Sequence, residues 1–208
     1  MVSAAAAVAG SDPGKEQVHL VATDQAAARA AVLRLADLGS GWTGGPKKAS
    51  LSSKPPCTNW QPKQSDLVLT GAAEADYKHP GLEIDSGAQV LRTAKMVQLD
   101  WQRTAVAPGL VGCLRSFLEK QSSADAKVVS VHRLAFARVP AADYTAAYRV
   151  EIAVSAGGTT VPVYSDVVLV GRGRTEIDLT VTAPAAAAAA VGSAERKLAS
   201  LLAERARA

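Results

Sequence analysis

The stretch YRVEIAVSAGGTTVPVYSDVVLVGRGRTEIDLTVT, residues 148–182, decides the fold class. It holds three runs in which apolar and polar residues alternate, the pattern of strands buried on one face. Gly157-Gly158 and Gly171-Arg172-Gly173 separate the runs and suit tight hairpin turns. We therefore predict a meander of three antiparallel strands. Pro162, in the middle run, indicates a bulge or a position without a ladder hydrogen bond.

Further strands and helices are predicted on both sides of this meander. The strand-rich region begins near residue 127, and residues 66–75 and 82–91 predict two earlier strands joined by a turn at 76–81. Apolar residues spaced by three and four predict helices near 24–38, 94–119 and 185–205. The predicted fold class is α+β, a single antiparallel sheet of about five or six strands with helices packed on it.

The composition is typical of a folded chain and unlike a nucleic-acid binder. The 208 residues are 48% hydrophobic and 20% charged, with a net charge of +4. Basic residues are scattered and aromatic residues are scarce, so we expect no nucleic-acid partner. No apolar run reaches the roughly 18–20 residues that a membrane span needs.

The first residues differ from the rest of the chain. Residues 1–15 are an alanine-rich tail or the remnant of a signal peptide, because Ala7-Val8-Ala9 fits the small-x-small cleavage pattern. The residue pattern leaves both readings open. We expect residues 16–208 to form a single α+β domain, since this length suits one domain.

The cysteine pattern favours a disulfide over a metal site or a redox motif. Cys57 and Cys113 are the two cysteines, and no C-x-x-C pair exists. In a secreted chain the expected state is a disulfide, whereas in the cytosol two separate thiols would be expected. We favour the disulfide and therefore a secreted or cell-envelope location. The bond would hold the loop of residues 39–64, which is rich in Gly, Pro, Ser and Lys.

The sequence holds no motif that assigns a catalytic residue, a metal site or a cofactor. The glycines of 39–44 match G-x-G-x-x-G, but a predicted helix precedes them where the dinucleotide motif needs a strand. The three histidines are isolated. One possible enzymatic function, the alternative to a non-enzymatic binding module, is a hydrolase that uses paired carboxylates of one hairpin. Its candidates are Glu74, Asp76, Glu83 and Asp85, although a solvated strand face also explains them.

The candidate ligand site lies in the loop of residues 39–64, against the start of the 94–119 segment. Trp42 and Trp60 offer apolar surfaces, while Thr43, Lys47 and Lys48 could orient an anionic group. The alternative is that both tryptophans are buried plugs under an inert loop.

Residues 36–42, Ala-Asp-Leu-Gly-Ser-Gly-Trp, resemble the A-D-L-P-x-G-W phrase of uncharacterised secreted proteins and lipoproteins of actinobacteria. The likeness covers about residues 24–205, with Gly39 where proline is usual. It implies a sensor-type, PsbP/Mog1-like α+β domain and no catalytic residues. The expected function is a non-enzymatic binding or sensor-type module of the cell envelope, with an unknown small molecule or envelope component as partner. A structural accessory protein without a small ligand is the further alternative.

Overall fold

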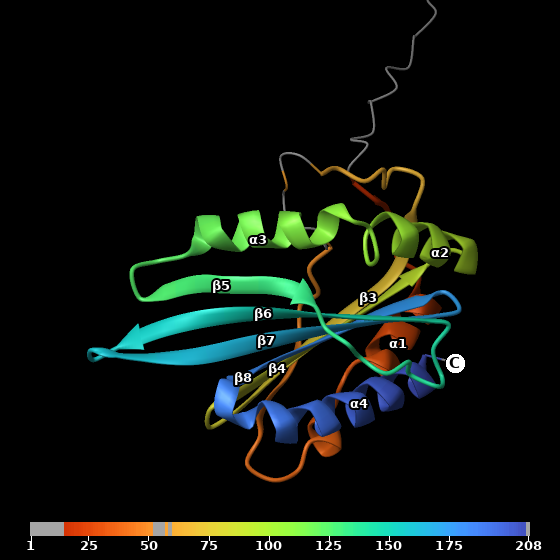
Figure 1. Cartoon of the computed structure of the whole chain (residues 1–208). Coiled ribbons are helices and arrows are strands. Elements are labelled where there is room, and N and C mark those ends of the chain that lie inside the picture. The colour runs from red at the N-terminus through yellow and green to blue at the C-terminus, as the bar shows by residue number, and fades with distance from the viewer. Residues whose placement is uncertain (1–14, 52–56, 58–59, 207–208) are drawn as a thin grey trace, which may run out of the picture.

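The computed structural model describes residues 15–51, 57 and 60–206, and there a sheet carries helices on both faces (Figure 1). The predicted tail or signal-peptide remnant lies outside these residues, except for Lys15. The strands are β1 (Gln17–Val18), β2 (Thr43–Lys47), β3 (Val68–His79), β4 (Leu82–Leu91), β5 (Ala126–Arg133), β6 (Tyr144–Ala156), β7 (Thr159–Arg172) and β8 (Thr175–Pro184). The helices are α1 (Ala22–Ala31), α2 (Ala94–Arg103), α3 (Gly109–Gln121) and α4 (Ala188–Arg205), with short 3-10 turns η1 (Leu35–Asp37) and η2 (Ala185–Ala187).

The sheet is mostly antiparallel, and its strand order is β1-β3-β4-β8-β7-β6-β5. β2 pairs with β3 off this path, and β1 is the one parallel partner among the described strands. The predicted α+β class is confirmed. Over the residues that the structure describes, the sheet has eight strands rather than five or six, because the short strands β1 and β2 join its β3 edge.

The predicted meander is present as β6, β7 and β8. The glycine turns have the positive φ angles that hairpins require, with Gly157 at 58° and Gly158 at 79°. Pro162 pairs with Ala153 without a register shift, and the pairing of β7 with β8 begins only at Val163. Of the two readings of Pro162, the structure therefore favours a position where β7 has a neighbour on one side only.

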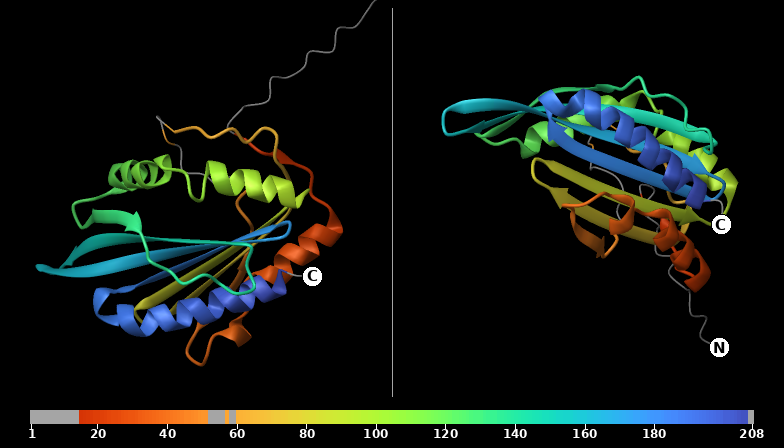
Figure 2. Two further views of the ribbon diagram at one scale, coloured as in Figure 1. Left: turned by 45° about the vertical axis from the view of Figure 1, so that its right-hand side comes forward. Right: turned by 90° about the horizontal axis from the view of Figure 1, so that it is seen from below.

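The two faces of the sheet are covered by different helices, as both views of Figure 2 show. α1 and α4 cover one face over an extensive core that includes Tyr77, Leu179 and Leu202. α2 and α3 cover the other face, where packing is divided between two smaller clusters. One of these includes Trp101 and Tyr148. The face under α2 and α3 is thus the less completely filled one.

The first helix is shorter than predicted, because the chain leaves the helix after Ala31. The backbone N–H of Leu33 donates to Ser86 Oγ at 3.1 Å, and the Tyr77 hydroxyl donates to the carbonyl of Leu33 at 3.0 Å. These partners on the sheet hold the segment extended. The apolar residues beyond residue 31 therefore do not form one face of a helix, and Leu35, within the predicted helix, is exposed.

Two boundaries near the predicted loop also differ from expectation. The loop of residues 39–64 contains β2, and β3 continues to His79 through most of the predicted turn at 76–81. The turn is confined to Pro80 and Gly81, where Gly81 has φ +76°. No helix in the described ranges is long and apolar enough to cross a membrane.

Candidate functional site

A cavity of about 410 Å³ lies between α2 and α3 and the sheet. On the sheet side it is bounded by the face of β3, β4, β8, β7 and β6 that points away from α1 and α4. The lining divides into an apolar wall and an acidic floor. The wall is formed by Trp60, Trp101, Ala105, Leu110, Leu114, Tyr148, Val167 and Leu169. The polar side chains are Ser50, Glu74, Gln89, Asp100, Thr104, Glu176 and Asp178.

Aromatic side chains give the apolar wall a defined shape. Trp101, on α2, stacks on Tyr144 with ring centroids 5.4 Å apart. The hydroxyl of Tyr148 donates to the carbonyl of Ala105, so the ring on β6 is tied to the turn after α2. Trp60 lies against the first turn of α3, where a Cβ on Gly109 would stand 2.8 Å from the indole Nε1. A glycine at that position is therefore what lets the indole lie so close to the helix.

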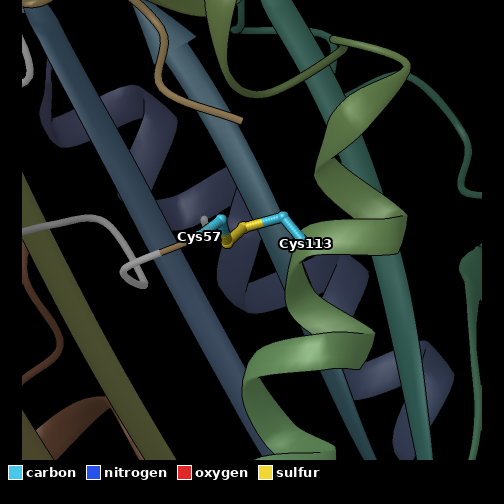
Figure 3. Close-up of a disulfide and its surroundings, with 2 residues drawn as sticks. All are labelled: Cys57 and Cys113. Carbon is cyan, nitrogen blue, oxygen red and sulfur yellow. A yellow bond between two sulfur atoms is a disulfide. The ribbon is translucent and has the colours of Figure 1, made fainter. Parts of the chain in front are cut away.

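The loop that carries Trp60 is fixed to both helices. Cys57 and Cys113 form a disulfide to α3, with their Cα atoms 5.5 Å apart (Figure 3). At the other end, Arg103 of α2 donates to both carboxylate oxygens of Asp66, at 2.7 and 3.2 Å. This guanidinium lowers the pKa of Asp66 to about 2. The bonds hold Trp60 over the cavity from both sides.

The acidic floor is built around Gly87. Glu74 of β3 and Asp178 of β8 are both register partners of Gly87 on the intervening strand β4. A Cβ on Gly87 would come within 2.9 Å of Asp178 Cγ, so the aspartate carboxylate lies over the glycine. The absence of a side chain at residue 87 thus lets Asp178 lean toward the strand of Glu74.

Asp178 lies deep in this floor and is only partly open to the cavity. Burial raises the pKa of its carboxyl to about 6, and the negative charges of Glu74 and Asp85 add to the effect. Lys47 acts in the opposite direction but does not cancel it. The floor is therefore a region of negative potential in which one carboxyl group keeps its proton to unusually high pH.

Lys47 joins the outer carboxylates of this floor. Its Nζ lies 2.9 Å from Asp85 Oδ1, 3.8 Å from Glu74 Oε2 and 3.9 Å from Asp76 Oδ1. The backbone N–H of Ser50 also donates to Glu74 Oε1 at 2.7 Å. Three of the four hairpin carboxylates of the hydrolase alternative are thus gathered here. The fourth, Glu83, pairs instead with Lys78 at 3.1 Å.

The residues of the predicted ligand site are not all brought together. Trp60 lines the cavity, and Lys47 contacts the lining residue Glu74. Lys48 is exposed to solvent. Trp42 packs on the opposite face of the sheet, beside the α1 and α4 core, with its ring 5.3 Å from that of His79.

Thr43 lies at the start of β2, where its hydroxyl donates to the carbonyl of Lys78 at 3.4 Å. The cavity-lining residues Asp178, Glu176 and Trp101 were not among the site residues predicted from the sequence. The alternation of these acids with Ile177 and Leu179 was visible. Alternation within one strand does not predict that a layer of helices covers that face of the sheet and encloses a cavity.

A second group of buried charges lies on the other face, beneath α4. Arg149 donates to both oxygens of Asp166, at 2.7 and 2.6 Å, and lies over the ring of Tyr164. Burial and the charge of Asp166 raise the pKa of Glu195, on α4, to about 7. Glu195 is 1% exposed and Asp166 is fully buried. The two carboxyl groups are thus enclosed by protein beneath α4, whereas the guanidinium of Arg149 is partly exposed.

Within the described ranges, no cluster of three or more His, Cys, Asp or Glu side chains has the arrangement of a metal site.

No protein-family model matches the chain, and no curated protein matches it. Among solved structures, the chain is similar to an uncharacterised protein of Mycobacterium smegmatis (Rv0999 ortholog). The two are 13% identical with a TM-score of 0.45, and the likeness covers 89% of this chain and 98% of the other.

Proposed function

We propose that the protein is a non-enzymatic binding or sensor-type module of the cell envelope or extracellular medium, whose small ligand occupies the cavity under α2 and α3. The observation that carries the proposal is the cavity itself, at about 410 Å³. Ligand sites are usually concave, measure roughly 300–1,000 Å³, and combine an apolar wall with a few polar groups. The wall and the acidic floor fit that description.

The disulfide supports the proposed location. Bonds of this kind persist in oxidising compartments and are rare in the cytosol. Cys57 and Cys113 also lie close to the cavity, since Leu110 and Leu114 on either side of Cys113 both line it. Intact mass of the folded protein, measured with and without alkylation, tests this part of the proposal. Two alkylated thiols in native protein would contradict it.

The binding function is tested by a thermal-shift screen with cell-wall fragments, lipids, sugars and small amines. A ligand that binds only the folded state raises the melting temperature. Val167→Trp, in the apolar wall, should fill the cavity and abolish the shift. The matched control is Val163→Trp, four residues away on the same face of β7 and outside the cavity lining. Equal shifts in the two variants would contradict the assignment to this cavity.

The hydrolase is the second candidate, and one observation favours it. Burial raises the pKa of Asp178 to about 6, so this carboxyl could act as a proton donor near a second carboxyl group, that of Glu74 across Gly87. Mass spectrometry of glycan and ester substrates after incubation would detect turnover. Turnover that Asp178→Asn abolishes would replace the binding proposal with this one.

A further inference from the structure

We propose that the cavity binds an amphipathic organic cation, with its ammonium group at Glu74, Glu176 and Asp178 and its apolar body against Trp60 and Tyr148. This inference rests on the proposed binding function and names the chemical class of the ligand. It differs from the anionic group that Lys47 and Lys48 suggested in the sequence.

The strand order separates the two halves of the ligand site. The acidic side chains that the sheet contributes come from β3 and β8, whereas its apolar side chains in the wall come from β7 and β6. The boundary falls between β8 and β7, where Asp178 and Leu169 are register partners. Neighbouring strands are about 4.8 Å apart. A ligand that fills the cavity therefore meets carboxylates and hydrocarbon within a few ångströms of each other.

The charge of the lining favours a cation over an anion or a neutral molecule. Four carboxyl side chains, those of Glu74, Asp100, Glu176 and Asp178, line the cavity, and no Lys, Arg or His of the described residues does so. Lys47 contacts the floor from outside, but its single charge is shared with Asp85, Asp76 and Glu74. An anion entering the site would lie beside like charges, which disfavours its binding.

The raised pKa of Asp178 reflects the same concentration of negative charge. The free protein holds a proton on Asp178 up to about pH 6, because burial disfavours the charged form and the negative charges of Glu74 and Asp85 add to the effect. A ligand cation beside these carboxylates would offset the repulsion between them.

Gln64 is 1% exposed and donates to Asp100 Oδ1 at 2.8 Å. Its carbonyl oxygen has no partner among the described residues.

Three probes with one ring and different charges test the inference on the full chain. They are 2-naphthylmethylamine, which is cationic at neutral pH, the neutral 2-naphthylmethanol and the anionic 2-naphthoate. Isothermal titration calorimetry at pH 7.5 should show that the amine binds at least tenfold more tightly than the alcohol and that the naphthoate binds more weakly still. Val167→Trp should abolish the binding of the amine and of the alcohol.

Carboxylate variants then separate the charge from the cavity shape. Asp178→Asn and Glu176→Gln should each lower the affinity for the amine at least tenfold and leave the affinity for the alcohol unchanged. The melting temperature of each variant verifies that it is folded. If the naphthoate or the alcohol binds more tightly than the amine, and Val167→Trp blocks that binding, the proposal that the ligand is a cation is wrong. The proposed binding function then still stands. If none of the three probes binds, the proposal of a cationic ligand is also wrong. The thermal-shift screen with the wider set of ligands then decides separately whether the protein is a binding module.

Discussion

Replacing Asp178 by asparagine should make the free protein more stable while weakening its affinity for a cation. Burial, Glu74 and Asp85 raise the pKa of Asp178 from 3.8 to about 6, a difference of about two pH units. Each unit corresponds to about 1.4 kcal/mol between the two protonation states. Above pH 7 the ionised carboxylate therefore lowers the free energy of unfolding by about 3 kcal/mol, and an amide of nearly the same shape removes that cost.

The pH dependence gives this prediction a definite sign. Between about pH 4 and pH 6 the folded protein holds the proton on Asp178 and the unfolded chain does not. The contribution of this carboxyl to the free energy of unfolding is thus largest below pH 4 and is lost as the pH rises through 6. Asp178→Asn lacks this loss. Its free energy of unfolding should therefore match that of the wild type near pH 4 and exceed it by about 3 kcal/mol at pH 8.

Urea unfolding of both proteins at pH 4, 6 and 8 measures the difference. The control is Asp66→Asn, because Arg103 lowers the pKa of Asp66 to about 2 and the effect should have the opposite sign. This pair is partly exposed, so the loss at pH 8 should be no more than about 1 kcal/mol. An Asp178→Asn variant that is no more stable than wild type at pH 8 would refute the electrostatic reasoning.

Three further predictions concern other parts of the structure. Burial and Asp166 raise the pKa of Glu195, so the free energy of unfolding of the wild type should fall as the pH rises from 5 to 8.5. Glu195→Gln should remove that dependence in urea titrations, and a persistent slope of the same size would refute it. Reduction of the Cys57–Cys113 bond should cost about 4 kcal/mol or less and increase the quenching of tryptophan fluorescence by iodide; unchanged quenching would contradict the role given to the bond. Gly87→Ala should lower stability by about 1–3 kcal/mol in thermal unfolding, because its methyl group would collide with the facing carboxylate, whereas a neutral result would show that the carboxylate lies elsewhere.

The meander could be predicted from the sequence because its information is local. Alternation from Tyr148 to Thr182 sets which side chains share a face, and Gly157, Gly158 and Gly173 set the turns. The end of α1 could not be predicted in the same way. It depends on Ser86 and Tyr77, which lie more than forty residues away and bond to the backbone of Leu33.

The candidate site was harder to predict than the fold, because its residues are brought together by strand order. Trp42 and Trp60 share one loop in the sequence, yet the first packs beside the α1 and α4 core and the second lines the cavity on the other face. Glu74 and Asp178 are far apart in the sequence and meet across Gly87 through two strand pairings. Alternation alone predicted that Asp178 leaves the core and could not reveal a second helical layer above it.

The central claim, that the cavity under α2 and α3 is a ligand site, is tested most directly by nuclear magnetic resonance. The chain has three tryptophans, and their indole N–H signals report on both faces of the sheet. Trp60 and Trp101 line the cavity, whereas Trp42 lies on the opposite face and is an internal control. During a titration with 2-naphthylmethylamine, the signals of Trp60 and Trp101 should shift together and saturate while that of Trp42 stays unchanged. Equal shifts of all three signals, or no shift of the two cavity signals, would contradict the account.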